Sequence, residues 1–150
     1  MLVSNIVSRY KMAGLPTKYK EIDDFLEKHL KVLRIQNEIL NRGKQPAAWD
    51  VFVRSCQQLD SMGAYLHKKA VELLSEILRG DLTVPGNDPG ILQHLKLTIR
   101  SFENEQSDFE VSRREAVDGE EMLAQATIFV SEAKQVNNLL ADIRKEDLSV

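Results

Sequence analysis

Apolar residues recur every three or four positions along most of the chain, which is the spacing of one face of an α-helix. The pattern is clearest between residues 46 and 79, where an unbroken 3-4-3-4 spacing links Trp49, Phe52, Cys56, Leu59, Gly63, Leu66, Ala70, Leu73 and Ile77. We call this set the central stripe. The spacing is typical of the buried face of a coiled-coil-type helix, and the small residues Gly63 and Ala70 would let a neighbouring backbone approach closely.

The same period predicts four further helices, at about residues 2–13, 17–42, 89–117 and 119–146. For residues 17–42 the expected apolar face is Ile22, Phe25, Leu26, Leu30, Leu33 and Leu40. For residues 89–117 it is Leu92, Leu95, Ile99, Phe102 and Phe109, and for residues 119–146 it is Leu123, Ala126, Val130, Ala133 and Leu140. No segment alternates apolar and polar residues between hairpin signals, as a strand would. The chain is therefore predicted to be all-α.

Glycine and proline mark the ends of these helices. The Arg-Gly pairs at 42–43 and 79–80 place a cation in the last turn, followed by a glycine that can adopt a left-handed cap. Pro46 and Pro89 suit the first position of a helix, where the missing N–H costs nothing. Asp88, just before Pro89, is expected to cap the helix that follows.

Residues 1–150 are predicted to form a single all-helical domain. Four long helices of similar length joined by short connections favour an antiparallel four-helix bundle, here preceded by a short N-terminal amphipathic helix. The alternative is a long helical hairpin or coiled coil that oligomerises, in which residues 89–145 form one helix of about 85 Å.

The choice between these architectures depends on the junction at Asp118-Gly119. Asp118 and Glu121 form a variant of the capping box, and a glycine is unfavourable inside a helix, so both features favour a break. Against a break, the junction has no proline, and Gln106 and Arg113 occupy apolar positions that a closed core would have to bury. We expect the break, and with it the bundle.

Composition agrees with a helical domain that carries its own core. The chain is 43% hydrophobic and 29% charged, with a net charge of −3. A chain of this length buries roughly two-thirds of its unfolded surface, enough for a core without disulfides.

Cys56 is the single cysteine and lies on the central stripe, so it is expected to be a small buried hydrophobe rather than a nucleophile. No apolar run reaches the ~18 residues of a membrane span, and a cytoplasmic location is expected.

Motifs with a catalytic mechanism are absent from the sequence. There is no phosphate-binding glycine loop, and no histidine has the Glu-x-x-His or His-Glu-x-x-His spacing of a metal site. The tripeptide Arg79-Gly80-Asp81 matches the one that integrins bind, but the chemistry of a helix end explains each of its residues. The chain is therefore expected to be no enzyme and to hold no cofactor or metal.

Charge is unevenly distributed along the chain. Residues 1–80 carry 13 Lys or Arg against 9 Asp or Glu, and residues 81–150 carry 7 against 14. This asymmetry has two interpretations: pairing between neighbouring helices, or a basic end that meets an anionic surface. The basic excess is too small for a phosphate-binding surface and no recognition motif is present, so nucleic acid is not expected as a partner.

Two segments are the best candidates for binding a partner. The N-terminal helix combines an apolar stripe with positive charge, and its candidate residues are Leu2, Val3, Ile6, Val7, Arg9, Tyr10 and Lys11. Such a helix can cap the bundle, dock in a groove of another protein or lie on an anionic membrane. The segment 103–121 carries eight acidic residues, and its candidate interaction face is Glu103, Glu105, Asp108 and Glu110.

These features predict a non-enzymatic helical protein-interaction module, such as an adaptor, a chaperone or a subunit of an assembly. Its expected partner is another protein or a second copy of the chain. The alternative is a membrane-surface targeting bundle, in which the basic amphipathic N-terminus faces anionic lipid.

Overall fold

The computed structural model describes residues 15–43, 46–82, 89–115 and 118–144, and these residues form helices and their connections, with no strand among them. The helices are α2 (Tyr19–Asn41), α3 (Pro46–Leu78), α4 (Pro89–Glu115) and α5 (Gly119–Arg144). Each bound lies within two residues of its predicted position. The all-α prediction is confirmed, whereas the predicted helix 2–13 and the cap Asp88 lie outside the described residues.

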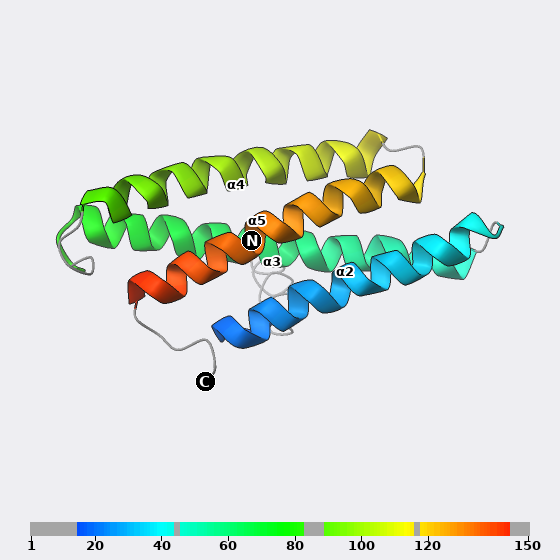
Figure 1. Ribbon diagram of the computed structural model, residues 1–150, viewed down its shortest axis with the longest axis horizontal. Helices are drawn as coiled ribbons and strands as arrows, with labels where there is room; N and C mark the ends of the chain where they lie inside the picture. The colour runs from blue at the N-terminus through cyan, green and yellow to red at the C-terminus, as the bar shows by residue number, and fades with distance from the viewer. Residues whose placement is uncertain (1–14, 44–45, 83–88, 116–117, 145–150) are drawn as a thin grey trace, which may run out of the picture.

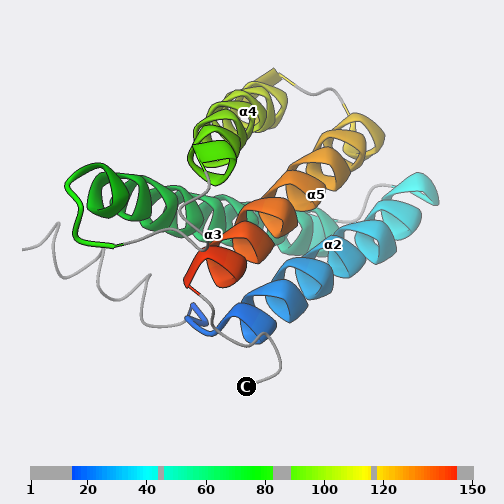
Figure 2. The same cartoon turned by 60° about the vertical axis from the view of Figure 1, so that its left-hand side comes forward.

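The four helices pack into a bundle. Helices α2 and α4 each lie beside both α3 and α5, and α3 and α5 also contact each other (Figure 1). Figure 2 shows α2 and α4 on opposite sides of the α3–α5 pair. Among the residues that the structure describes, no helix is both long enough and apolar enough to span a membrane.

Helices α4 and α5 are separate and lie side by side, so the single long helix of the alternative architecture is wrong (Figure 1). The Asp118 carboxylate caps α5, because its Oδ1 accepts a hydrogen bond of 3.0 Å from the Glu121 N–H. Gly119 follows in a buried position, where an added Cβ would lie 2.5 Å from Asn37 Oδ1. The glycine is thus needed for the close approach of α2, and the predicted break at this junction is confirmed.

Removing the cap is expected to destabilise the bundle. Asp118→Ala should lower the free energy of unfolding by about 0.5–2 kcal/mol, because the first-turn amide of α5 loses its acceptor. Asp118→Asn keeps an acceptor oxygen and should remain close to the wild type. Urea unfolding followed by circular dichroism measures both variants, and equal losses for Ala and Asn would contradict the role of this hydrogen bond.

The central stripe supplies most of the α3 contribution to the core. Seven of its members are buried: Phe52, Cys56, Leu59, Gly63, Leu66, Ala70 and Leu73. Ile77 is half-buried, and Trp49 is 42% exposed, so the prediction that Trp49 lies in the core is wrong. Trp49 lies in the first turn of α3, where its ring stacks on Phe52 at the edge of the core instead of entering it.

Close packing of α3 against α5 occurs at Gly63. A Cβ at this position would lie 2.5 Å from Cζ of Phe129, which is itself fully buried. The Phe129 ring is held by Phe109, with ring centroids 4.7 Å apart, and by Phe102, with centroids 5.5 Å apart. The sequence predicted that a neighbouring backbone would approach position 63, but the atoms nearest to this position belong to the side chains of Phe129 and Phe102.

Two buried asparagines link α2 and α5 in a reciprocal way. Asn37 of α2 lies against Gly119, the first residue of α5. Asn137 of α5 donates a hydrogen bond of 2.8 Å from Nδ2 to the carbonyl oxygen of Tyr19, the first residue of α2. Among the described residues, the Oδ1 atoms of both asparagines have no hydrogen-bond partner. Each helix therefore begins beside the asparagine of the other.

The predicted glycine and proline positions at the helix ends are confirmed, whereas Arg42 and Arg79 follow the last turns of α2 and α3 instead of lying within them. Gly80 adopts a positive φ of 81°, and its N–H donates to the Ile77 carbonyl oxygen at 3.1 Å, which closes α3 with a glycine cap. Gly43 likewise has a positive φ, of 147°, just after α2. Pro46 and Pro89 are the first residues of their helices, as expected from their fixed φ.

Candidate functional site

A pocket of about 290 Å³ opens between the start of α3, the end of α4 and the first turn of α5. Apolar side chains, two of them aromatic, line it together with polar and charged ones: Trp49, Phe52, Val53, Cys56, Gln57, Glu110, Arg113, Arg114 and Met122. We call it the Trp49 pocket. Its volume lies just below the roughly 300–1,000 Å³ range of ligand-binding pockets.

The pocket exists because α4 stops contributing apolar side chains to the bundle near its end. After the buried Phe109, the next position of the α4 face is Arg113. Its guanidinium cannot be buried in the core without a partner. It reaches instead across to α3, where Nη1 lies 3.0 Å from Asp60 Oδ1, and its side chain is 28% exposed. The sequence placed Arg113 at a position that a closed core would bury, and the ion pair with Asp60 keeps its charge out of the core. The pocket is the gap beside this ion pair.

One wall of the pocket is an aromatic pair. The rings of Trp49 and Phe52 are stacked with an interplanar angle of 6° and centroids 5.6 Å apart. Phe52 is buried, whereas Trp49 keeps 42% of its surface exposed. Burying a tryptophan contributes strongly to binding, and an exposed tryptophan beside a pocket is typical of an interface rather than of an inert surface.

The opposite wall carries charge from α4. Arg113 has its partner in Asp60, but Arg114 is exposed and no acidic side chain pairs with it within the part of the chain that the structure describes. Glu110 also lines the pocket, one helical turn before Arg114. Arg114 can therefore offer its guanidinium to an incoming carboxylate.

Cys56 lies at the base of the pocket but is not a reactive thiol. The residue is 3% exposed, and burial raises the pKa of its thiol to about 12, against a smaller opposing effect of the Arg113 charge. At neutral pH the sulfur is protonated, and a protonated thiol is a poor nucleophile. The prediction that Cys56 is a small buried hydrophobe is confirmed.

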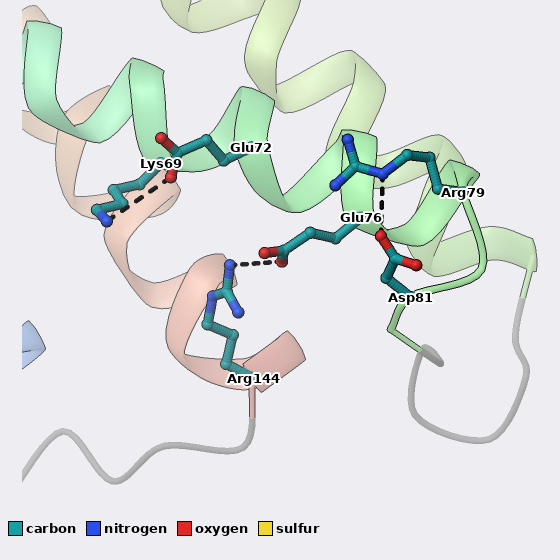
Figure 3. Close-up of polar contacts among 6 residues, drawn as sticks. All are labelled: Lys69, Glu72, Glu76, Arg79, Asp81 and Arg144. Carbon is teal, nitrogen blue, oxygen red and sulfur yellow. Dashed lines mark hydrogen bonds and ion pairs between the residues drawn. The ribbon is translucent and has the colours of Figure 1, made fainter.

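A second pocket, of about 350 Å³, lies between the start of α2, the second half of α3 and the end of α5. Its charged residues are already paired with one another: Arg144 Nη2 lies 2.8 Å from Glu76 Oε2, and Lys69 Nζ lies 3.6 Å from Glu72 Oε2 (Figure 3). The side chain of Arg144 points from α5 toward α3 (Figure 3). The Arg144–Glu76 pair joins α5 to α3, the Lys69–Glu72 pair lies within α3, and together they leave little charge for a ligand.

The tripeptide at 79–81 is likewise engaged within the chain. Arg79 Nε donates to Asp81 Oδ2 at 2.9 Å, beyond the end of α3 (Figure 3). The Asp81 N–H donates to the Glu76 carbonyl oxygen at 2.9 Å and so belongs to the helix end. This geometry supports the interpretation of the tripeptide as a helix terminus.

The four residues of the predicted acidic face point in different directions. Glu103 Oε2 lies 2.8 Å from His67 Nε2 on α3, and Glu105 accepts a hydrogen bond of 3.1 Å from Gln125 on α5. Asp108 is exposed, and Glu110 lines the Trp49 pocket. Only part of this set is thus free to meet a partner. The other candidate face, within residues 1–14, lies outside the described residues.

Sequence reasoning missed the Trp49 pocket, although two of its signals were visible. One was the polar Arg113 on the apolar face of the fourth segment, and the other was a single tryptophan at the start of the central stripe. Their meeting depends on how α3 and α4 pack, which periodicity along one helix does not report.

No protein-family model, curated protein sequence or solved structure matches the chain. The class of protein is therefore defined by the described residues themselves: an all-α helical bundle with a surface pocket of mixed aromatic and cationic character. Within those residues, no group of three or more His, Cys, Asp or Glu side chains could hold a metal ion.

Proposed function

We propose that the chain is a non-enzymatic protein-interaction module, an antiparallel four-helix bundle that binds a protein partner through the Trp49 pocket. The observation that carries this proposal is the half-exposed Trp49, stacked on the buried Phe52 beside two arginines. Tryptophan and arginine are the residue types most enriched at the energetic centres of protein interfaces. An adaptor, a chaperone or an assembly subunit would each use such a surface.

The available energy is sufficient for a binding anchor. If a partner covers the exposed 42% of Trp49, roughly 100 Å² of apolar surface leaves water, and this contributes about 2.5 kcal/mol. That value falls in the range of about 2 kcal/mol or more that defines a hot spot. Phe52 holds the indole in place, so binding costs little additional side-chain entropy.

The test is a comparison of captured proteins. The full chain, Trp49→Ala and Ile35→Ala are immobilised and exposed to native extract of the organism that encodes the chain, and bound proteins are quantified by mass spectrometry. Ile35 is the matched control, because it is 46% exposed on α2, away from the pocket. We expect a discrete set of proteins to be retained by the wild type and Ile35→Ala and depleted about tenfold or more with Trp49→Ala.

One control and one refuting outcome make that result interpretable. Circular dichroism must show the same helicity for all three proteins, since Trp49 also contacts Phe52. An identical set of captured proteins on all three would contradict a role for the pocket.

A membrane-surface role for the basic N-terminus is the alternative proposal, and the adjoining described residues give it less support. Lys20 lies beside Asp24, with Nζ and Oδ1 3.6 Å apart. Glu21 and Asp24, with Lys28, also line a shallow hollow next to Leu15, so the described surface closest in sequence to the N-terminus is not uniformly basic. Such a mixed surface attracts anionic lipid less than a basic one does.

A further inference from the structure

The charges around the Trp49 pocket are close to balanced. Arg113 pairs with Asp60 between α4 and α3, with Nη1 and Oδ1 3.0 Å apart. Glu110 lies one turn before Arg114 on α4, and both side chains line the pocket. Opposite charges at this helical spacing partly cancel each other's field. An occupant without net charge therefore matches the lining better than an ion does.

The size of the pocket suits a single large side chain. Its volume of about 290 Å³ falls short of the roughly 300–1,000 Å³ that pockets for whole ligands occupy. The pocket also lies at the edge of the core, because Phe52 is buried while Trp49 keeps 42% of its surface exposed. A side chain that reaches this edge from another protein can enter without moving the core.

The aromatic pair in the wall favours a further ring. The rings of Trp49 and Phe52 are nearly parallel, at an angle of 6°, with centroids 5.6 Å apart. Aromatic rings attract one another in offset-stacked and edge-to-face arrangements, beyond the effect of the area that they bury. Because the indole is only partly covered by the chain itself, it can pack against one more ring.

Other groups in the lining share this preference for an aromatic ring. Met122 and Cys56 bring sulfur atoms, which make favourable contacts with the edges of rings. Arginine stacks on the faces of rings, and Arg113 already lies over Phe109, with Cζ 5.7 Å from the ring centroid. Arg114 is exposed and lines the pocket, so its guanidinium can cover a bound ring in the same way.

We propose that the Trp49 pocket holds one uncharged aromatic side chain, a Phe, Tyr or Trp, of the partner protein. The ring packs against the indole of Trp49, and the planar guanidinium of Arg114 covers it from α4. The N–H groups of that guanidinium point along its plane and stay free for water or a polar group at the rim. The inference rests on the proposed function and adds the chemistry of the partner.

The chain offers a direct test, because Trp49 is its only tryptophan and its emission reports on the pocket. Short peptides are selected from a random display library on the full chain. We expect the selected peptides to share one Phe, Tyr or Trp and to share no Asp or Glu. A synthetic peptide with Phe at the shared position should change the Trp49 emission in a saturable way, because phenylalanine does not absorb where tryptophan is excited.

A saturated analogue separates the chemistry of the ring from apolar burial. Cyclohexylalanine is similar to Phe in size and at least as apolar, but it has no π-system. The Phe peptide should bind the wild type with a Kd about fivefold lower than the cyclohexylalanine peptide. Arg114→Gln should reduce this ratio to about twofold or less, because the guanidinium is lost. Arg100→Gln is the control and should keep the ratio, because Arg100 is exposed on the same helix and does not line the pocket.

Several outcomes would overturn the inference. These are a selection that yields no binders, selected peptides that share an acidic or aliphatic residue instead of an aromatic one, or equal Kd values for the Phe and cyclohexylalanine peptides on the wild type. A dimer that dissociates on Trp49→Ala would identify the occupant as a second copy. A shift of the Trp49 emission on deletion of residues 1–14 would identify it as the chain's own N-terminus.

The inference and the proposed function can fail separately. If Trp49→Ala loses captured proteins but the Phe and cyclohexylalanine peptides bind alike, the pocket binds a partner without a preference for a ring. If Trp49→Ala loses none, the proposed function itself is wrong.

Discussion

Replacing Leu66 by Ala is expected to lower the free energy of unfolding by about 2–5 kcal/mol, which is the cost of a large cavity in a packed core. Leu66 is at the middle of the central stripe and has no exposed surface. Leu59 and Leu73, one heptad before and after it, are equally buried, so the surroundings have little freedom to collapse into the space. Urea unfolding followed by circular dichroism gives the free energy directly.

A matched leucine on the surface provides the control. Leu97 of α4 is 53% exposed, and Leu97→Ala should change the free energy of unfolding by no more than about 0.5 kcal/mol. Equal unfolding midpoints for Leu66→Ala and the wild type would show that the α3 face assigned to the core is wrong.

Gly63→Leu is expected to destabilise the bundle by about 3 kcal/mol, the upper part of the range for overpacked cores. In an exposed helix, replacing glycine by leucine would instead stabilise the helix by about 1 kcal/mol through its higher helix propensity. At Gly63 the packing is therefore expected to reverse the change in stability that helix propensity alone predicts. The reason is the position of Phe129, whose Cζ would lie 2.5 Å from the new Cβ. Phe129 has no room to retreat, because Phe102 and Phe109 pack against its ring.

The neighbouring position separates the clash from other effects of a leucine on α3. Ala64 follows Gly63 on the same helix and is exposed, so Ala64→Leu should leave the stability within about 0.5 kcal/mol of the wild type. Thermal and urea unfolding of the two leucine variants can be compared directly. Similar stabilities for Gly63→Leu and Ala64→Leu would refute the close packing of α3 on α5.

The helices were predictable because their signals are local. Apolar period, proline at a first position and glycine at a cap each act within one or two turns, so the observed bounds agree with the predicted ones to within two residues. Trp49 shows the limit of this reasoning. A stripe identifies which face of a helix is apolar, but not where the neighbouring helices stop covering it, and Trp49 lies at that edge.

The candidate site was less predictable, because it is formed by residues far apart in the chain. Trp49 and Arg114 reach one pocket from different helices, and this pocket lies beside the Arg113–Asp60 ion pair that joins those helices. Buried polar residues were missed for a related reason. Asn37 and Asn137 occupy positions on apolar faces, and hydrophobicity alone does not reveal that a polar side chain is buried there.

The reciprocal asparagines of α2 and α5 bear on how this sequence excludes competing folds. If α5 slipped along α2 by one heptad, Asn137 would lose the Tyr19 carbonyl oxygen and be left buried among apolar side chains, a loss of about 1–3 kcal/mol for an unsatisfied group. Asn37 would at the same time meet a side chain instead of the bare backbone of Gly119. Leucine at both positions would bury more apolar surface, but it would fit several alignments almost equally well. We infer that the two buried amides select one register of α5 along α2. They lower the stability of the native bundle somewhat, but they destabilise every other register more and so widen the energy gap between them.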